Sequence, residues 1–435
     1  MVHRLYGPGA RPAFVVRARL GYSSCVTKKT GYDVVVVGGG PSGMTAAYSA
    51  AKAGADVLLV DSRPTPGEKI LLSGGGRCNV LPVAVDPGAY VTDSSSHTLR
   101  KILLSWPLEE VRAFLEGPIG LRLVDQKRTG KVFPVGPGGG AEVRDAFIVA
   151  LKRSGVRIRG NCRVVDISPD ERRRVVVESG PGIVAARVVL ATGGTSYPRT
   201  GSDGSGFGIA RRLGHSVSPL YPALVPLYGG SEAHHSLAGL SLRVRLSIGE
   251  GKGRVSSTGD FLFTHRGYSG PVVLNAAHAV ARAKLVEAPS VRVSWLDRES
   301  ADWDLVLSPG PGTVRAALAK TLPGRLGDVL LDELGLLDVE RSALRRDDRA
   351  RTLTALVDYE LPIERAGGFG EAEVTGGGVP LGEVLPRTLA SRLVPTVFFC
   401  GEVLDAFGPI GGCNFLWAFV TGRLAGLGAS SGCAS

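Results

Sequence analysis

Three glycines and an aspartate stand at the spacing of a dinucleotide-binding site. Gly38, Gly40 and Gly43 follow the G-x-G-x-x-G pattern, and Asp61 comes eighteen residues after the last of them. In such a site the first glycine permits a tight turn and the second lets a pyrophosphate approach the backbone. The third lets a helix pack closely on a strand, and the acid accepts hydrogen bonds from ribose hydroxyls. These four residues therefore predict binding of a nucleotide cofactor.

The elements that must position these residues are indicated by the flanking sequence. The unbroken apolar run Val34–Val37 is typical of a strand buried on both faces of a parallel sheet. A helical pattern runs from Pro41 to Ala53, with the proline acceptable in the first turn, and Val57–Val60 forms a second apolar strand. Glycine-rich turns alone are weak signals, but strand, glycines, helix, strand and acid within 29 residues are much stronger. We therefore expect a Rossmann-like βαβ unit.

Two more apolar strands run into glycines later in the chain. Val188–Leu190 leads into Ala191-Thr192-Gly193-Gly194, and Val397–Phe399 leads into Cys400-Gly401-Glu402. A glycine at the carboxyl end of such a strand lets backbone approach a ligand. Because the two strands lie about two hundred residues apart, we expect one cofactor-binding sheet that an insertion interrupts in sequence.

The insertion has its own pattern. Ser241–Ile248 alternates apolar and polar residues, as a half-buried strand does. Short strands are also expected at Asp260–Thr264 and Val291–Trp295. Helical patterns follow at Thr313–Leu322, Arg325–Leu336 and Arg349–Tyr359. The arginine run from Arg341 to Arg351 is diluted by Asp347 and Asp348, which favours a solvated helix face over a nucleic-acid patch.

The predicted fold class is α/β, with a Rossmann-like domain split by an inserted β-barrel plus a helical subdomain. The expected parts are a leader (1–30), the first part of the Rossmann-like domain (31–217), a barrel-like insert (218–310), its helical part (311–370) and the second part of the Rossmann-like domain (371–430). At 435 residues the chain is long enough for several cores.

The positive charge is concentrated in the leader. The chain carries a formal charge of +11, and residues 1–30 hold six basic residues and no Asp or Glu. Subtracting these six leaves about +5 for the remainder, which gives only weak support for a nucleic-acid partner. An Arg-rich, acid-free leader without a continuous apolar core favours an organellar transit peptide, mitochondrial more than plastid, over a secretory signal. The alternatives are a disordered extension or a misassigned start, with a cytoplasmic protein.

The cysteine spacing and the hydropathy argue against a zinc protein, a dithiol redox protein and a membrane-spanning protein. The six cysteines are scattered without a C-x-x-C pair, which argues against a zinc site or a dithiol redox pair and suits a reducing compartment. No apolar run reaches transmembrane length, and the nearest, Ala406–Gly422, is broken by Pro409 and four glycines.

A second glycine cluster lies between basic residues. The run from Lys69 to Asn79 reads KILLSGGGRCN and is suited to cradling phosphate or a flavin edge with backbone N–H groups. Here the sequence resembles the YhiN-type, aminoacetone-oxidase-like NAD(P)H/FAD-dependent oxidoreductases, whose signature is K-x-x-x-S-G-G-G-R-C-N. A flexible surface loop is the alternative reading of this run.

The resemblance continues over roughly residues 33–428. The similar motifs are Gly130–Val135, Leu190–Pro198, Gly201–Gly206, Phe263–Pro271, Val374–Val379, Gly401–Asp405 and Gly408–Phe415. Three positions depart from the family pattern: Lys131 replaces an arginine, Cys413 replaces an aromatic residue, and the acid of the Gly201–Gly206 motif has moved to Asp203. The run Gly136–Ala141 imitates a second nucleotide loop but lacks an acid after a following strand, so we expect an ordinary loop.

The resemblance implies bound FAD reduced by NAD(P)H. The residues expected to bind FAD are Gly38, Gly40, Pro41, Ser42, Gly43, Asp61, Ser62, Arg63, Lys69, Gly74, Gly75, Gly76, Arg77, Cys78, Asn79, Thr192, Gly193, Gly194, Gly401, Glu402, Asp405, Gly411, Gly412 and Asn414. Glu402 stands where flavoproteins carry an acid that binds the ribityl chain. Gly411-Gly412 opens an expected helix, Asn414–Leu424, whose amino end would favour negative charge on the flavin. No metal site is expected.

The resemblance also implies reduction of a polarised carbon–carbon double bond. Family members are associated with reducing a uridine of large-subunit ribosomal RNA to dihydrouridine, and others with ring reduction in steroid-like acids. Such a reduction needs a proton donor across the ring from the flavin. Cys78, Tyr197 and His265 are the candidates, since all lie within motif runs, and Arg77 would favour the Cys78 thiolate.

Three functions remain open at this stage. An RNA-modifying flavin reductase needs a basic rim, for which Lys127, Arg128, Lys131 and Arg266 are candidates. A reductase of small unsaturated molecules or an amine oxidase needs a closed apolar pocket instead. A non-catalytic FAD-binding protein would be reduced slowly by nicotinamides.

Overall fold

The computed structural model describes residues 31–126, 130–168, 173–249, 254–283 and 289–431. The expected leader at residues 1–30 and two candidates for the basic rim, Lys127 and Arg128, lie outside these ranges.

The βαβ unit forms where the sequence predicts it. β1 (Tyr32–Val37) and β2 (Val57–Val60) pair in parallel, with Val36 opposite Leu59, and α1 (Pro41–Lys52) connects them. The apolar runs of both strands are almost completely buried, as expected for strands covered on both faces. The carboxyl ends of these strands therefore carry Gly38 and Asp61 to the same edge of the sheet.

Segments from across the chain complete this sheet. Its strands follow the order β6-β2-β1-β9-β8-β7, and β19 also pairs with β9. The bounds are β6 (Arg157–Arg159), β7 (Val164–Ile167), β8 (Arg173–Val177), β9 (Ile183–Leu190) and β19 (Val397–Phe399). β6, β2, β1, β9 and β19 pair in parallel, whereas β8 pairs antiparallel with both of its neighbours, β9 and β7. The prediction of a Rossmann-type domain assembled from both halves of the chain is confirmed.

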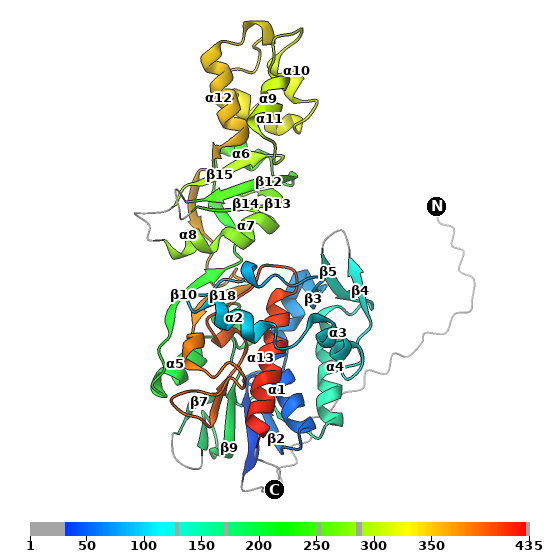
Figure 1. The fold of residues 1–435 in the computed structure, drawn as a ribbon, viewed down its shortest axis with the longest axis vertical. Coiled ribbons are helices and arrows are strands. Elements are labelled where there is room, and N and C mark those ends of the chain that lie inside the picture. Colours follow the sequence, from blue (N-terminus) through cyan, green and yellow to red (C-terminus); the bar gives the residue numbers. More distant parts are fainter. Residues whose placement is uncertain (1–30, 127–129, 169–172, 250–253, 284–288, 432–435) are drawn as a thin grey trace, which may run out of the picture. The chain divides into compact units, whose positions relative to one another are not determined.

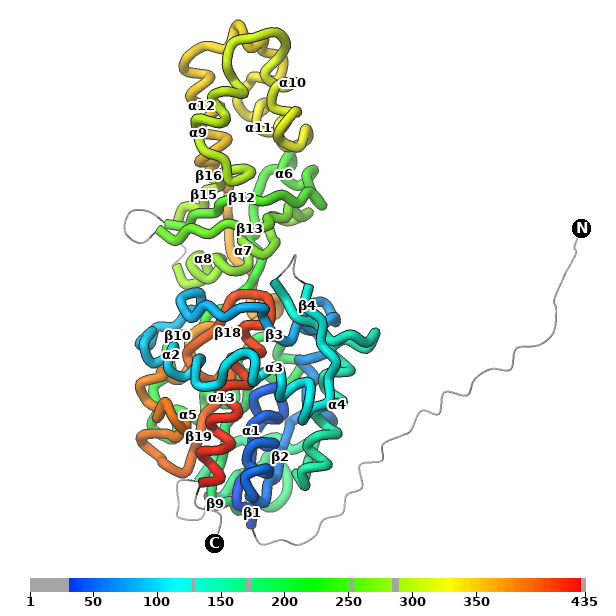
Figure 2. The backbone as a smooth tube through the Cα atoms, turned by 45° about the vertical axis from the view of Figure 1, so that its right-hand side comes forward, coloured from blue at the N-terminus to red at the C-terminus, as the bar shows by residue number. Residues whose placement is uncertain are grey.

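The last helix, α13 (Cys413–Ser430), lies against α1 in both views (Figures 1 and 2). Two glycines permit this contact. A Cβ on Gly422 would collide with the carbonyl oxygen of Ser42, and one on Gly426 would collide with that of Ala46. α13 is longer than the helix expected at Asn414–Leu424. This close packing places the middle of α13, at Gly422, beside the start of α1.

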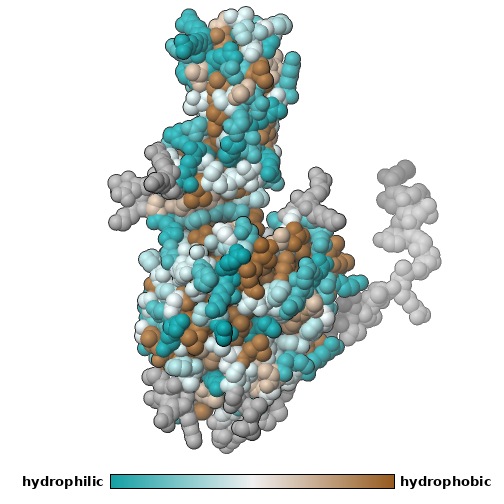
Figure 3. Space-filling view, viewed as in Figure 1, coloured by the Kyte–Doolittle hydropathy of each residue, from teal (hydrophilic) through white to brown (hydrophobic). Residues whose placement is uncertain are grey.

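The remaining parts of this domain surround the sheet. The helices are α2 (Ser96–Leu103), α3 (Leu108–Glu116), α4 (Gly140–Arg153) and α5 (Ser205–Arg212). A small antiparallel sheet has the order β3-β5-β4, from β3 (Leu81–Pro82), β4 (Leu123–Gln126) and β5 (Lys131–Pro134). Apolar side chains gather on the face that carries this small sheet (Figure 3), and Val124 and Val135 are among the exposed ones.

The insertion leaves and returns through paired strands. β10 (Ser218–Ala223) and β18 (Val374–Gly378) form an antiparallel ladder. Between them lies a seven-stranded sheet of order β16-β15-β12-β13-β14-β11-β17. Its strands are β11 (Leu227–Gly229), β12 (Ser241–Ile248), β13 (Val255–Thr264), β14 (Gly267–Ser269), β15 (Val291–Trp295), β16 (Tyr359–Glu360) and β17 (Ile363–Ala366). Among the described residues no ladder joins β16 to β17, so the closed barrel expected from the sequence is not confirmed.

The helical part of the insertion also follows the expected pattern, although the bounds of its helices differ from those expected. Its helices are α9 (Ser300–Val306), α10 (Val314–Leu318), α11 (Gly324–Leu334) and α12 (Arg346–Val357), which lie together in Figure 2. Short helices α6 (Glu232–Ser236), α7 (Pro271–Ala276) and α8 (His278–Arg282) accompany the sheet. The arginine run forms internal contacts: Arg349 bonds Asp304, and Arg341 bonds two backbone carbonyls. No described helix is both long and apolar enough to cross a membrane.

Candidate functional site

A pocket of about 350 Å³ opens at the carboxyl edge of the large sheet. Its walls come from the turn after β1, the segment after β2, the Ala191–Ser205 region, the start of β18 and the first turn of α13. These segments contain most of the motifs named above, although they are spread over about 380 residues of sequence. The fold thus brings the motif residues into one continuous cavity.

The three glycines of the first turn have different surroundings. A Cβ on Gly43 would collide with the carbonyl oxygen of Gly38, and one on Gly38 would collide with that of Ala191. Gly38 also has a φ of +102°, which favours glycine. A Cβ on Gly40 would meet no protein atom within 4 Å. Gly38 and Gly43 therefore serve close packing, whereas Gly40 opens toward the pocket, as a pyrophosphate site requires.

The carboxylate of Asp61 is held beside this turn. Its Oδ2 accepts a hydrogen bond from the Gly39 N–H at 2.7 Å, and its Oδ1 accepts one from the Arg63 N–H at 2.7 Å. Burial raises the pKa of Asp61, and these two hydrogen bonds act in the opposite direction. The carboxylate is thus fixed in the pocket wall with lone pairs left for ribose hydroxyls.

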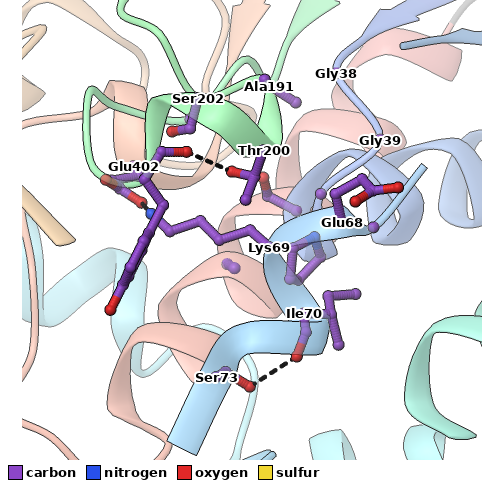
Figure 4. A pocket seen from close by; sticks show the side chains of 18 of the residues that line it. Gly38, Gly39, Glu68, Lys69, Ile70, Ser73, Ala191, Thr200, Ser202 and Glu402 are labelled. Atoms are coloured by element: carbon purple, nitrogen blue, oxygen red, sulfur yellow. Dashed lines mark hydrogen bonds and ion pairs between the residues drawn. The ribbon is translucent and has the colours of Figure 1, made fainter. Parts of the chain in front are cut away.

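A polar network joins four motifs at the pocket wall, where Lys69 and Glu402 line the cavity. Lys69 Nζ donates to Glu402 Oε2 and to Ser196 Oγ, both at 2.7 Å. Ser196 Oγ and the Thr375 N–H both donate to Glu402 Oε1, at 2.8 and 2.9 Å. Figure 4 shows the Lys69 side chain extending toward Glu402. Glu402 is therefore oriented by three separate segments, and it lines the pocket.

The first turn of α13 closes one end of the pocket. Gly411, Gly412 and Asn414 line it. The Asn414 side chain accepts from the Gly408 N–H and donates to the Gly408 carbonyl, each at 2.9 Å, which fixes the loop before the helix. The Lys131 side chain lies 3.5 Å from the position that a Cβ on Gly411 would take. A helix amino end and an ammonium group both favour an electron-rich ligand here.

Two hydroxyl groups in the wall lack partners of their own. Thr192 Oγ1 and Ser202 Oγ are buried and have no hydrogen-bond partner among the described residues, and both residues line the pocket. Buried polar groups are normally paired. Together with the open Gly40, they fit a cavity shaped for a polar ligand such as FAD.

Not every predicted cofactor residue faces the pocket. Those that line it are Gly38, Gly40, Pro41, Ser42, Asp61, Ser62, Lys69, Gly74, Gly75, Asn79, Thr192, Gly193, Glu402, Gly411, Gly412 and Asn414. Those outside its lining are Gly43, Arg63, Gly76, Arg77, Cys78, Gly194, Gly401 and Asp405. Arg77 lies over the Phe133 ring at 4.6 Å, and Asp405 Oδ2 accepts from Ser94 Oγ at 2.9 Å and the Asp93 N–H at 3.1 Å. These contacts give both residues structural partners.

The three candidate proton donors are separated in space. Tyr197 lines the pocket, and burial raises the pKa of its phenol, with Glu373 and Glu371 adding to the rise. Cys78 is completely buried behind the glycine loop, and burial raises the pKa of its thiol to about 11. The expectation that Cys78 is a thiolate is therefore wrong, because burial raises the pKa of the thiol even though Arg77 is its neighbour in sequence. His265 is exposed in the turn between β13 and β14, outside the pocket lining.

Glu68 and Glu373 are pocket residues that the sequence analysis did not select. Glu68 is next to the Lys69 motif, and Glu373 immediately precedes the Val374–Val379 motif. Both could have been selected from the sequence, because each is a carboxyl residue directly before a glycine-rich motif. The surrounding protein atoms partly desolvate Glu373 and raise its pKa, while Lys131 and Lys69 act in the opposite direction.

Comparison with known proteins agrees with this geometry. The family profile described as "HI0933-like protein Rossmann domain" matches residues 32–428. The chain belongs to this family. The family fixes its class: the protein is an FAD-dependent oxidoreductase.

Curated relatives cover nearly the whole chain. The "Ribosomal RNA dihydrouridine synthase" of Escherichia coli (strain K12) is 31% identical over 89% of this chain and 95% of its own length. The "3-dehydro-bile acid delta(4,6)-reductase" of Clostridium scindens is 32% identical over 91% of this chain and 98% of its own. The "Ribosomal RNA dihydrouridine synthase" of Haemophilus influenzae is 28% identical over 88% and 95%.

Proposed function

We propose that this oxidoreductase uses NAD(P)H to reduce a uridine of large-subunit ribosomal RNA to dihydrouridine. The observation that carries the proposal is the extent of the match to two proteins of that name, which includes the insertion as well as the cofactor domain. Bound FAD would supply the hydride chemistry. The residues of the chain would hold it, orient the substrate and provide a proton.

A cationic surface next to the pocket supports an RNA substrate. The guanidinium groups of Arg266 and Arg365 lie 4.6 and 4.2 Å from the centre of the Tyr228 ring. Both arginines are exposed, and the Tyr228 hydroxyl donates to Glu371. Exposed guanidinium planes bind phosphates and stack on unpaired bases.

This surface is connected to the pocket through one short segment. Glu371 comes two residues before Glu373, and the Tyr197 N–H donates to the Phe369 carbonyl at 3.3 Å. Residues 369–373 therefore run from the arginine surface to the pocket wall. A base flipped from an RNA strand bound at the arginines would have a short path to the cofactor.

The run Gly136–Ala141 packs against other parts of the chain and is therefore not a second nucleotide-binding loop. Without such a loop, the nicotinamide would bind only transiently. A Cβ on Gly139 would collide with the Gly76 carbonyl, and one on Gly140 would lie 2.5 Å from that of Ile70. This loop thus supports the Lys69–Asn79 segment. We propose that NAD(P)H uses the open side of the pocket and leaves before the substrate enters.

Reduction of a small unsaturated molecule is the second candidate. It is favoured by the similar match to the bile-acid reductase of Clostridium scindens. The two candidates differ in salt dependence, since RNA binding through arginines weakens steeply as salt rises. The rate of reduction of a small neutral acceptor would change little as the salt concentration rises.

The test is an anaerobic mixing experiment with residues 31–435. We expect NADH or NADPH to bleach the flavin absorbance and ribosomal RNA to restore it, with dependence on salt. Reoxidation by small acceptors alone would favour the second candidate. Slow bleaching by both nicotinamides would contradict both candidates and favour a non-catalytic FAD protein or an amine oxidase.

We also propose that residues 1–30 direct the protein to the mitochondrion, an organelle that has its own ribosomes. The support is the excess of six basic residues without an acid. A fluorescent protein fused after residues 1–30 should enter mitochondria, and a diffuse cytoplasmic signal would contradict this.

A further inference from the structure

Four acidic residues line the pocket. Hydrogen bonds define the setting of two of them, and a charge interaction defines the position of a third. Asp61 is bonded by two backbone N–H groups. Glu402 is bonded by Lys69, Ser196 and Thr375. Glu68 lies close enough to Asp61 to act on its pKa, which places it at the nucleotide-turn end. Glu373 is the fourth.

Glu373 faces the pocket without a hydrogen bond to any described residue. Glu373 is exposed, and both it and its neighbour Val374, the first residue of β18, line the cavity. Glu373 acts electrostatically on Tyr197 and is acted on by Lys131 and Lys69. Lys131 is the residue that lies beside Gly411. Through Lys131, Glu373 is associated with the α13 end of the pocket.

The setting of this carboxyl suits proton transfer. The walls raise its pKa above the usual 4.5, so a protonated fraction persists closer to neutral pH. The ammonium groups of Lys131 and Lys69 stabilise the carboxylate that remains after a proton leaves. A general acid works best when its pKa approaches the working pH.

We propose that Glu373 is the catalytic proton donor of this site. The inference rests on the proposed function, reduction of a polarised carbon–carbon double bond. The substrate receives a hydride, with both electrons, at one carbon, and these electrons come ultimately from the nicotinamide, which is oxidised. The O–H bond of Glu373 breaks and a C–H bond forms at the other carbon. The Glu373 carboxylate then regains a proton from solvent, and Tyr197 positions the substrate ring beside it.

The test separates electron transfer from proton transfer. Glu373→Gln keeps the shape and removes the acid, Glu373→Asp keeps the acid on a shorter chain, and Glu364→Gln is the matched control on exposed β17. Each variant is reduced with NAD(P)H and then mixed with ferricyanide, ribosomal RNA or 2-cyclohexen-1-one. Ferricyanide accepts electrons without a proton, so it measures the cofactor alone.

We expect NAD(P)H to bleach the flavin of Glu373→Gln, and the reduced variant to reduce ferricyanide, both at the wild-type rate. Its reduction of RNA or the enone should fall by about 10²–10⁴-fold, the usual contribution of a general acid. Glu373→Asp should recover part of that loss, and Glu364→Gln should match the wild type. Double-bond reduction within a few-fold of wild type, or an equal loss with ferricyanide, would overturn the proposal.

A second readout does not depend on turnover. The visible spectrum of the bound flavin is recorded against pH for wild type and Glu373→Gln. We expect a shift with an apparent pKa above 4.5 that is absent from the variant. If the wild type reduces neither RNA nor the enone, the proposed function fails, and only this titration then tests whether Glu373 is a proton-exchanging group beside the flavin. An identical titration in both proteins would then overturn the role of Glu373.

Discussion

Lys69 Nζ lies 2.7 Å from Glu402 Oε2, although the two residues are 333 positions apart in the chain. Lys69 follows the βαβ unit, and Glu402 follows β19, the strand added after the insertion. The ion pair is only partly exposed, with side-chain exposures of 25% and 18%. It therefore joins the two halves of the split domain inside the pocket.

Breaking this pair should loosen the cofactor more than the fold. Lys69→Met leaves the Glu402 carboxylate with two of its donors, and the unpaired charge costs about 1–3 kcal/mol. We expect a lower ratio of flavin to protein and a modest fall in melting temperature. The double variant Lys69→Met/Glu402→Gln should lose less than the sum of the two single variants. Strict additivity in a double-mutant cycle would contradict the coupling.

The second and third glycines of the turn, Gly40 and Gly43, offer a matched pair. Gly43→Ala places a methyl group against the Gly38 carbonyl and should cost about 1–3 kcal/mol or more in unfolding free energy. Gly40→Ala meets no protein atom and should leave stability within about 0.5 kcal/mol. It should instead weaken FAD binding by about tenfold or more, which corresponds to about 1.4 kcal/mol. Urea unfolding and FAD titration distinguish the two effects, and equal behaviour of the variants would refute this division.

Cys78 should prove chemically silent. Its thiol is buried and its pKa is raised to about 11, so almost none is ionised near neutral pH. We expect iodoacetamide to leave Cys78 unmodified in the folded protein at pH 7 and to modify it when pH approaches 11 or the chain unfolds. Cys78→Ala should retain flavin bleaching and acceptor reduction. Loss of acceptor reduction alone in that variant would return Cys78 to the list of proton donors.

Asp203 should stabilise the fold in a pH-dependent way. Burial would raise its pKa, but the Arg163 guanidinium at 2.5 Å and the Ser205 N–H at 3.1 Å outweigh this and lower it below 3.8. A carboxyl whose folded pKa is depressed contributes its full stability above its unfolded pKa and loses it as pH falls through the folded value. Asp203→Asn should thus melt below the wild type at pH 7, and the gap should close below about pH 3.8. A gap that stays constant with pH would show that the carboxylate charge is not the cause.

The sequence predicts the parts of the site that are local. Gly38, Gly40 and Asp61 lie within one βαβ unit, so their spacing alone specifies their geometry. Buried strands and the split domain follow from apolar runs in the same way. The closure of the inserted sheet depends on pairing between edge strands, which periodicity does not report.

The rest of the site depends on contacts between distant segments. Asp405 stands in a motif beside Glu402, yet it turns toward Ser94 rather than the pocket. Arg77 is adjacent to Cys78, but its side chain lies over Phe133 and burial decides the thiol pKa. Glu373 becomes a candidate only when Lys131 and Tyr197 are brought beside it by the fold.

In the proposed reaction, a uridine in RNA receives the electrons of NAD(P)H. The most direct measurement is nucleoside mass spectrometry of an unmodified large-subunit ribosomal RNA transcript after anaerobic incubation with the protein, FAD and NADPH or NADH. We expect one or a few defined uridines heavier by two hydrogen atoms, formed only when both the protein and a nicotinamide are present. RNA of unchanged mass, with the flavin bleached and stable until a small acceptor is added, would contradict the RNA substrate.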